Sequence, residues 1–332
     1  RGSKMTAKVP VIDLLLPEEE VVKAIRKGCE EIGFLCIINH GVDPAVVAGA
    51  FKAMHDFFTL PLETKMKSKG TPAGYMPLQA QTLDPENQTE PDQKEGYGMV
   101  EEVPAGHDPN EFPFHGKRVY PDDSDVPGWR EAVMGYYGAV RSLAMRMLRY
   151  IALAMEVPDA DAFIAKNFEF PIFHMRMLRY EPRASNPAEG RLAAGAHTDW
   201  GLITLLKTDG GEGLQVQPRN SSEWLDVEEP ANAFVVNLGD LQQRWTNDVF
   251  TSRPHRVMLK SDKVRYSIAY FCDADERALV ECLPSFQSPS RPPRYSPITQ
   301  AAYLAAKYEQ TIKKEFNVVS ASVERVEESA VV

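Results

Sequence analysis

Three residues with side chains suited to metal binding lie in the second half of the chain. His197 and Asp199 are separated by one residue, and His255 follows later, directly after a proline. If residues 195–199 form a strand, His197 and Asp199 point to the same side, because side chains alternate along a strand. Two imidazoles and one carboxylate are typical of Fe(II) sites that leave coordination positions open. We therefore predict an iron site at His197, Asp199 and His255.

Zinc accepts the same types of ligand, so the residue types alone leave a second metal possible. A structural zinc site normally has four protein ligands, and the sequence offers no evident fourth. The remaining histidines that we considered are predicted to be non-ligands; they are His40, His55, His107, His115 and His174.

A second pair with the same spacing follows ten residues after His255. Arg265 and Ser267 would also share one face of a strand. A guanidinium group donates two parallel hydrogen bonds to a carboxylate, and a hydroxyl can add a third. An open metal site beside such a clamp suggests a metal-bound acid as co-substrate. The alternative is that Arg265 only forms an ion pair across the surface of a sheet.

The elements around these residues are predicted to be short antiparallel strands with glycine-containing turns between them. The expected strands are residues 174–180, 195–199, 202–207, 214–218, 224–227, 233–238, 255–259 and 264–271. About eight strands at this spacing indicate a jelly roll or a small sandwich.

The first half of the chain is predicted to consist mainly of helices and loops. Apolar residues at helical spacing predict helices that begin at Pro17, Asp43 and Trp129, the last extending to Met155. Residues 68–127 are rich in turn signals and aromatic residues, so we expect loops laid over the body of the protein. A shorter helix is expected at residues 161–168, and a final one at residues 299–316, outside the barrel. Short strands are expected at residues 9–13 and 34–38.

We expect one domain, residues 5–332, with four regions. They are an N-terminal helical and loop region (5–125), scaffold helices (126–170), a jelly-roll catalytic core (171–290) and a C-terminal helix with a tail (291–332). The fold class is thus mainly β with flanking helices.

The charge and cysteine content narrow the range of partners. The formal net charge is -10, which disfavours nucleic acid or an anionic membrane as a partner. No apolar run approaches the ~20 residues of a membrane span, and the N-terminus shows no signal-peptide region. The four cysteines are predicted to be buried free thiols of a reducing compartment. We expect a cytoplasmic monomer that acts on a small molecule.

These motifs together resemble the isopenicillin N synthase-like oxygenases, which depend on Fe(II) and, in most members, on 2-oxoglutarate. The N-terminal half carries Val9-Pro-Val-Ile-Asp13, Asn39-His-Gly-Val42 and the run from Phe57 to Lys65. The catalytic half carries His197-Thr-Asp-Trp-Gly-Leu-Ile-Thr-Leu205, Asn237-Leu-Gly-Asp240, Pro254-His-Arg-Val257 and Arg265-Tyr-Ser267. The resemblance extends from about residue 9 to residue 290, and it implies a double-stranded β-helix (jelly-roll) core.

The resemblance also implies residue roles. His197, Asp199 and His255 would bind iron, and Arg265 and Ser267 would hold the distal carboxylate of 2-oxoglutarate. In plant-type members an Asn-x-Tyr element helps to hold the co-substrate, but here the segment reads Met177-Leu-Arg-Tyr-Glu-Pro182, so Tyr180 and Arg176 are the candidates for that role. Tyr180 matches the tyrosine of an Arg-Tyr variant of that element. Arg176, on the same strand face, would supplement it.

The expected reaction couples O2 and 2-oxoglutarate to hydroxylation, desaturation or cyclisation of a small organic molecule, with succinate and CO2 as products. Family analogy favours a secondary metabolite or a nucleobase as substrate. Residues expected to line the substrate pocket are Tyr75, Met76, Phe114, Trp200 and Phe271. Two alternatives remain: a 2-oxoglutarate-independent iron oxidase or oxidative cyclase, and a non-catalytic jelly-roll binding protein.

Overall fold

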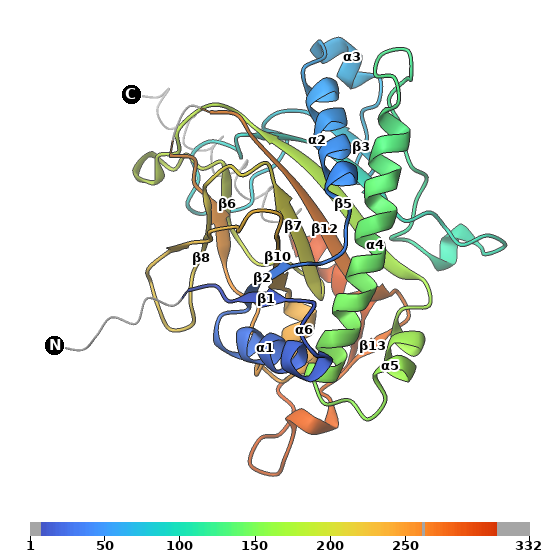
Figure 1. Cartoon of the computed structure of the whole chain (residues 1–332), viewed down its shortest axis with the longest axis vertical. Coiled ribbons are helices and arrows are strands. Elements are labelled where there is room, and N and C mark those ends of the chain that lie inside the picture. Colours follow the sequence, from blue (N-terminus) through green and yellow to red (C-terminus); the bar gives the residue numbers. More distant parts are fainter. Residues whose placement is uncertain (1–7, 261–262, 311–332) are drawn as a thin grey trace, which may run out of the picture.

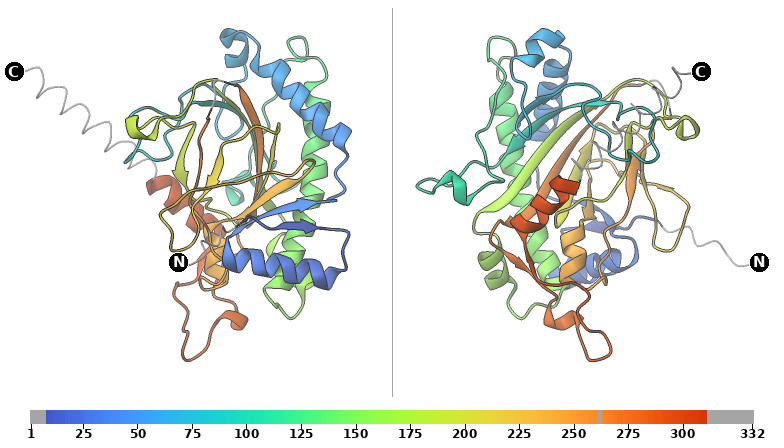
Figure 2. Two further views of the ribbon diagram at one scale, coloured as in Figure 1. Left: turned by 60° about the vertical axis from the view of Figure 1, so that its left-hand side comes forward. Right: turned by 180° about the vertical axis from the view of Figure 1, so that it is seen from behind.

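Two β-sheets form the centre of the molecule, and helices cover one of them. The computed structural model describes residues 8–260 and 263–310. The large sheet has eight strands, and a smaller sheet of four strands lies opposite it (Figure 1). Helices α2 and α4 run along the outer side of the large sheet, away from the small one, as the two further views also show (Figure 2). The inner faces of the two sheets therefore enclose the interior in which the candidate site lies.

The strand order within each sheet mixes early and late segments of the chain. The large sheet has the order β1-β2-β10-β7-β12-β5-β4-β3, and the small sheet has the order β6-β11-β8-β9. The strands of the large sheet are β1 (Val11–Asp13), β2 (Phe34–Ile38), β3 (Gly74–Met76), β4 (Lys94–Val100), β5 (Pro171–Tyr180), β7 (Ile203–Thr208), β10 (Phe234–Leu238) and β12 (Arg265–Asp275). The small sheet consists of β6 (Ala194–His197), β8 (Leu214–Val216), β9 (Leu225–Asp226) and β11 (His255–Val257). A two-stranded sheet pairs β13 (Leu279–Val280) with β14 (Ile298–Thr299).

The helices form because apolar residues recur every three or four positions and bury one face. In α4 (Trp129–Ala154), Val133, Tyr136, Val140 and Met147 are fully buried against the sheet. The other helices are α1 (Glu18–Glu31), α2 (Pro44–Phe58), α3 (Leu62–Met66), α5 (Ala160–Asn167) and α6 (Asp240–Trp245).

Alternation along β12 separates two environments. Ile268 and Tyr270 point outward into the core beneath the helices. Arg265, Ser267 and Phe271 have the opposite parity and therefore face the interior between the sheets. The prediction that Arg265 and Ser267 share a face is confirmed by this register.

The eight strands expected in the second half are present, with ends shifted by a few residues. Strand β6 ends at His197, so Asp199 lies just beyond it rather than within it. Within residues 5–125, the expected strands at 9–13 and 34–38 are present as β1 and β2, whereas β3 and β4 were not predicted; all four join the large sheet. Strand β4 escaped notice because it contains Gly96 and Gly98. A side chain at Gly98 would clash, since its Cβ would lie 1.9 Å from the carbonyl oxygen of Pro72.

Other expectations concern the cysteines and the ends of the chain. All four cysteines are buried and free, as predicted. Residues 300–310 are helical, and the remainder of the helix expected at 299–316 lies outside the described residues. In the described part of the chain, no helix is both long and apolar enough to cross a membrane.

Candidate metal and co-substrate site

The structure brings His197, Asp199 and His255 together at the edge of the small sheet. His197 and His255 are directly opposed across β6 and β11, and their ring centroids are 4.3 Å apart. Asp199 Oδ1 lies 3.9 Å from Nε2 of His197 and 3.7 Å from Nε2 of His255. One ligand atom from each residue lies within 4.8 Å of the others, a spacing at which a single metal ion could contact all three. The three residues therefore come together as their spacing predicted; they are called the metal cluster below, meaning the cluster of metal-ligand residues.

The carboxylate of Asp199 presents one oxygen to the cluster and uses the other for hydrogen bonds. Thr204 Oγ1 donates to Asp199 Oδ2 at 2.5 Å, and Asn237 Nδ2 donates to the same oxygen at 2.6 Å. Although burial alone would raise the pKa of Asp199, the two imidazoles and these two donors hold it below its usual value. Asp199 is therefore ionised and held in orientation, as a metal-binding carboxylate should be.

Both imidazoles are oriented by backbone carbonyls. Nδ1 of His197 lies 2.8 Å from the carbonyl oxygen of Gly195, and Nδ1 of His255 lies 3.2 Å from that of Arg253. A carbonyl only accepts, so each Nδ1 carries the proton and each Nε2 lone pair faces the cluster. Burial is the largest cause that lowers the pKa of His197, followed by the positive charge that His255 would carry when protonated. The neutral imidazole that a metal requires is thus favoured.

Arg265 and Ser267 form a buried donor group on the facing sheet. Arg265 is 2% exposed and Ser267 is 1% exposed. Both terminal nitrogens of Arg265 and the hydroxyl of Ser267 find no hydrogen-bond partner among the described residues. A buried guanidinium without a partner is costly, so this group fits an anionic ligand that supplies a carboxylate.

The register of the strands relates the donor group to the metal cluster. Ser267 is opposite Thr208 on β7, and Phe271 is opposite Thr204, which binds Asp199. Four residues of β7 thus separate the two groups, roughly 13 Å along the strand at about 3.3 Å per residue. A dicarboxylate that also contacts a metal ion held by the cluster fits this span.

Tyr180 lies beside Arg265 and Ser267, and these three residues are called the donor end below. Tyr180 is opposite Arg265 in the register of β5 and β12, and its ring centroid lies 4.9 Å from the guanidinium carbon. Glu181, the departure from the plant-type pattern, forms an ion pair with Arg179 at 2.7 Å on the other side of the sheet.

Among the residues expected to line the substrate pocket, Tyr75 was assigned wrongly. Tyr75 and Met76 are neighbours in β3, so they point to opposite faces and cannot both reach the interior. Tyr75 packs on Phe57 under the helices and donates a hydrogen bond to Glu95 at 2.6 Å. Met76 lies in register with Gly96 and Leu178 on the inner face.

The other expected lining residues gather near a residue from the C-terminal helical segment. Tyr308 stacks on Phe114 with ring centroids 6.1 Å apart, and it meets Trp200 edge to face at 5.1 Å. Phe271 lies beneath Arg176, whose guanidinium carbon is 5.8 Å from the ring centroid. Arg176 lies in register with Ala269 rather than with Arg265, so it is not part of the donor end.

Sequence reasoning missed several residues that position the cluster. Thr204 and Asn237 belong to the motifs named above, but the spacing of residues in the sequence does not predict that they donate hydrogen bonds to Asp199. Asp273 is a buried carboxyl whose pKa is raised to about 7, mainly by burial and also by the charge of Asp199. It packs so closely on Gly201 that a Cβ there would lie 1.7 Å from Oδ1. This contact explains the glycine two residues after Asp199.

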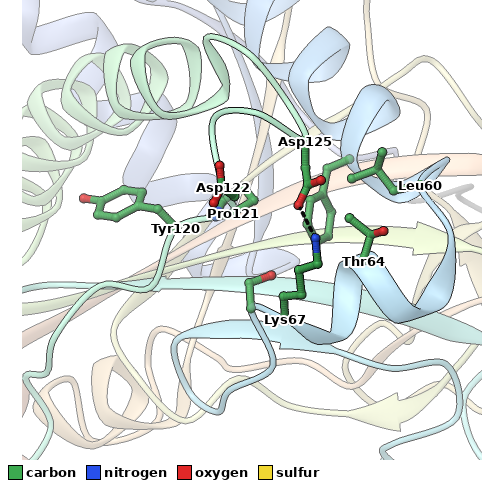
Figure 3. A pocket seen from close by; sticks show the side chains of 9 residues that line it. Leu60, Thr64, Lys67, Tyr120, Pro121, Asp122 and Asp125 are labelled. Atoms are coloured by element: carbon green, nitrogen blue, oxygen red, sulfur yellow. Dashed lines mark hydrogen bonds and ion pairs between the residues drawn. The ribbon is translucent and has the colours of Figure 1, made fainter.

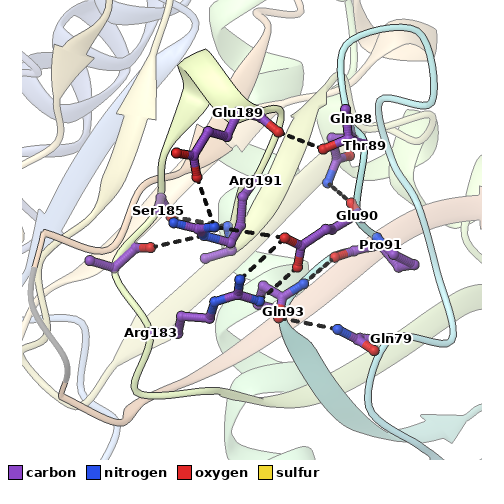
Figure 4. A network of polar contacts seen from close by, with 12 residues as sticks. Gln79, Gln88, Thr89, Glu90, Pro91, Gln93, Arg183, Ser185, Glu189 and Arg191 are labelled. Atoms are coloured by element: carbon purple, nitrogen blue, oxygen red, sulfur yellow. Dashed lines mark hydrogen bonds and ion pairs between the residues drawn. The ribbon is translucent and has the colours of Figure 1, made fainter.

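A polar network holds the start of β6. Asp92 is fully buried; its Oδ1 accepts the N–H of Gly195 at 3.0 Å, and its Oδ2 accepts Lys94 Nζ at 2.7 Å. The segment leading to Asp92 is tied to the loop between β5 and β6 by Glu90, which binds both Arg183 and Arg191 (Figure 4). The network therefore supports the residue whose carbonyl orients His197.

A hollow of about 240 Å³ lies on the other side of the large sheet. It is bordered by α2, α3 and the segment at residues 120–125, and Lys67 and Asp125 form an ion pair across it at 3.0 Å (Figure 3). None of its lining residues belongs to the metal cluster or to the donor end, so it plays no part in the site described above.

Replacing Asn237 with alanine is expected to weaken Fe(II) binding or catalysis by about 10- to 100-fold, because Asp199 would lose one of its two orienting donors. The measurement is Fe(II) affinity by anaerobic competition with a chelator, together with the rate of succinate formation. Asn110→Ala, at an exposed position, is the matched control. An Asn237 variant with unchanged metal affinity and rate would contradict this role.

The packing of His174 predicts a dependence of stability on pH. Burial, and secondarily the charge of Arg176, lowers the pKa of His174 to about 3. The folded state keeps this imidazole neutral, whereas the unfolded chain protonates it below pH ~6.5, so stability falls as the pH drops from there towards about 3. At about pH 5 the expected loss is about 2 kcal/mol. Urea unfolding of chelator-treated protein should show a smaller loss in His174→Gln than in the parent, whereas the exposed control His55→Gln should behave like the parent.

The site belongs to a recognisable class. An open three-ligand cluster and a buried arginine whose terminal nitrogens have no partner among the described residues, enclosed by the two sheets of a double-stranded β-helix, are typical of a non-haem iron oxygenase. Residues 9–123 match the family model for the N-terminal region of non-haem dioxygenases in morphine synthesis, and residues 172–274 match the 2OG-Fe(II) oxygenase superfamily.

Individual relatives agree with the family models. A 2-oxoglutarate-Fe(II) type oxidoreductase, hxnY, of Emericella nidulans is 36% identical over 308 residues, covering 88% of this chain and 85% of that protein. Azadirone synthase LFS of Melia azedarach is 30% identical over 309 residues, covering 90% of this chain and 91% of that protein. A Neurospora crassa protein solved in complex with alpha-KG and thymine is 29% identical with a TM-score of 0.78, covering 91% of this chain and 97% of that one.

The chain belongs to the Fe(II)/2-oxoglutarate-dependent dioxygenase family. It is an oxidoreductase that uses Fe(II) and 2-oxoglutarate and acts on a small molecule. The expected reaction class is confirmed by these findings. They favour it over the 2-oxoglutarate-independent and non-catalytic alternatives.

Proposed function

We propose that His197, Asp199 and His255 hold Fe(II), and that Arg265, Ser267 and Tyr180 hold the distal carboxylate of 2-oxoglutarate. The observation that carries this proposal is the buried Arg265–Ser267 group, whose donors have no partner among the described residues, in the same interior as the three-ligand cluster. When bound, iron with 2-oxoglutarate and O2 supplies the oxidising power that yields succinate, CO2 and an oxidised C–H bond.

The chain's own residues supply geometry and exclusion of water. Asp199 and the two imidazoles fix the metal on one side of the interior. Arg265 aligns the keto acid through a charge-assisted fork, so binding energy sets the orientation of the reacting atoms. The three protein ligands would leave part of the metal's coordination sphere open for the co-substrate.

The substrate is proposed to be a small organic molecule that is hydroxylated, desaturated or cyclised next to Phe271, Trp200, Met76 and Phe114. The relatives named above, one a synthase of azadirone and one bound to thymine, support a small molecule rather than a macromolecule. The working unit is proposed to be a monomer. Four buried free thiols support a reducing, cytoplasmic location, and the net charge of -10 argues against nucleic acid as a partner.

The test is turnover of 2-oxoglutarate by the purified protein. With Fe(II) and O2, succinate should form slowly without added substrate and not at all after treatment with a chelator. Zn(II) in place of Fe(II) should give no succinate. O2 uptake that continues at full rate without 2-oxoglutarate would refute the assignment of the Arg265 group to the keto acid.

A further inference from the structure

Arg176 occupies a distinct place in the interior. It lies on the inner face of β5, opposite Ala269 on β12 and Gly98 on β4. Its two neighbours across the sheet are therefore small, which leaves room above them for the long guanidinium side chain. It is four residues from Tyr180, roughly 13 Å along the strand, so it lies well away from the donor end.

The guanidinium group of Arg176 is partly buried and has no hydrogen-bond partner on its most enclosed nitrogen. Its Nε is buried and has no hydrogen bond, and in the described part of the chain Arg176 forms no ion pair. Burial is the largest influence on the pKa of Arg176 and lowers it, while Tyr308 and the carboxylate of Asp199 act in the opposite direction. Asp199 already accepts hydrogen bonds from Thr204 and Asn237 through Oδ2, and its Oδ1 faces the imidazoles. No side chain in the described part of the chain takes up the donors of Arg176, so they are available to a ligand that displaces water from them.

Aromatic side chains lie around the same region. Phe271 lies 5.8 Å from the guanidinium carbon of Arg176. Trp200 directly follows Asp199 in the chain, and Tyr308 contacts both Trp200 and Phe114. Tyr308 is also close enough to Arg176 to raise its pKa. Aromatic faces favour flat, apolar or partly polar partners, which they contact by stacking or edge to face.

We propose that Arg176 and these aromatic side chains bind the substrate, and that the substrate is a flat ring bearing an oxygen that accepts a hydrogen bond, either a carboxylate or a ring carbonyl. The guanidinium fork donates to that oxygen and thereby sets which C–H bond is held near the metal. The ring lies against Phe271 and the group formed by Trp200, Phe114 and Tyr308. This inference rests on the proposed function, because it takes the metal cluster and the Arg265 group as the two fixed points.

The experiment compares four ligands on the same protein. Protein loaded with Mn(II) and 2-oxoglutarate is titrated with benzoate, uracil, cyclohexanecarboxylate and toluene, and binding is followed by saturation-transfer NMR. We expect one or both of the flat acceptors to bind, benzoate if the oxygen is a carboxylate and uracil if it is a ring carbonyl. The non-planar acid and the ring without an acceptor should bind about tenfold more weakly or not at all.

Arg176→Met should weaken binding of the flat acceptor by about tenfold or more, because a charge-assisted hydrogen bond is lost. The KM for 2-oxoglutarate in succinate formation should change by less than about twofold, whereas Arg265→Met should raise it strongly. Tyr308→Ala should also weaken binding of the flat acceptor. Arg130→Met, an exposed arginine of α4 that contacts Tyr120, is the matched control.

Three outcomes overturn the inference: no flat acceptor binds, the Arg176 variant binds it as the parent does, or the Arg176 variant raises the KM for 2-oxoglutarate as the Arg265 variant does. Failure of the proposed function is separate, since the parent would then form no succinate from 2-oxoglutarate.

Discussion

Replacing His197 with alanine is expected to abolish detectable succinate formation and to remove tight Fe(II) binding. The variant keeps only Asp199 and His255 near the metal, and the Lewis acid contributes several kcal/mol to catalysis. A loss of that size corresponds to a rate reduction of at least about 1,000-fold. The measurements are the Fe(II) content of anaerobically loaded protein and the rate of 2-oxoglutarate turnover.

A matched variant separates the metal role from a general effect of removing an imidazole. His55 is exposed on α2, with a side chain 63% accessible, so His55→Ala should retain both iron and activity. His197→Ala should remain folded, because the histidine lies at the edge of the small sheet and is partly accessible. Ordinary turnover by folded His197→Ala would show that the metal is held elsewhere.

Replacing Arg265 with methionine is expected to raise the KM for 2-oxoglutarate by about 100-fold, because removing one partner of a buried hydrogen-bonded charge pair costs roughly 2–5 kcal/mol. The maximal rate at saturating 2-oxoglutarate should fall much less, since the metal cluster is untouched. Arg265→Lys keeps the charge but lacks the planar fork, so its KM should lie between those of the parent and the methionine variant.

The same substitution gives a second, independent readout. Without the co-substrate, Arg265 is a buried cation whose terminal nitrogens have no partner among the described residues. Methionine of similar length removes that cost, so the ligand-free variant should melt at the same temperature as the parent or higher. A lower melting temperature together with an unchanged KM would identify Arg265 as a structural residue instead.

The metal-ligand residues and the Arg265–Ser267 pair could be predicted from the sequence more completely than the residues that line and support the site. Side-chain alternation is enough to place Arg265 and Ser267 on one face, and it also excludes Tyr75 once Met76 is placed inward. The pairing of His197 with His255 depends on how β6 and β11 meet, which spacing alone does not determine. The resemblance to known motifs supplied that information.

The contacts that could not be predicted from the sequence are mostly polar and join residues far apart in the chain. Asn237 reaches Asp199 from a strand 38 residues later, and Asp92 reaches Gly195 from 103 residues earlier. Such contacts are determined by tertiary packing and leave no local periodicity. Strand β4 was hidden for a different reason, because glycines chosen for close backbone approach have low strand propensity.

The placement of the metal cluster and of Arg265 on opposite sheets has a consequence for the lifetime of the protein in a cell. A keto acid held at both ends would link the two sheets of the jelly roll non-covalently. Any ligand that binds only the native fold lowers the fraction of chains open to proteases, in proportion to its concentration over its dissociation constant. Abundance of the enzyme would then follow the supply of 2-oxoglutarate and iron even when no substrate is present.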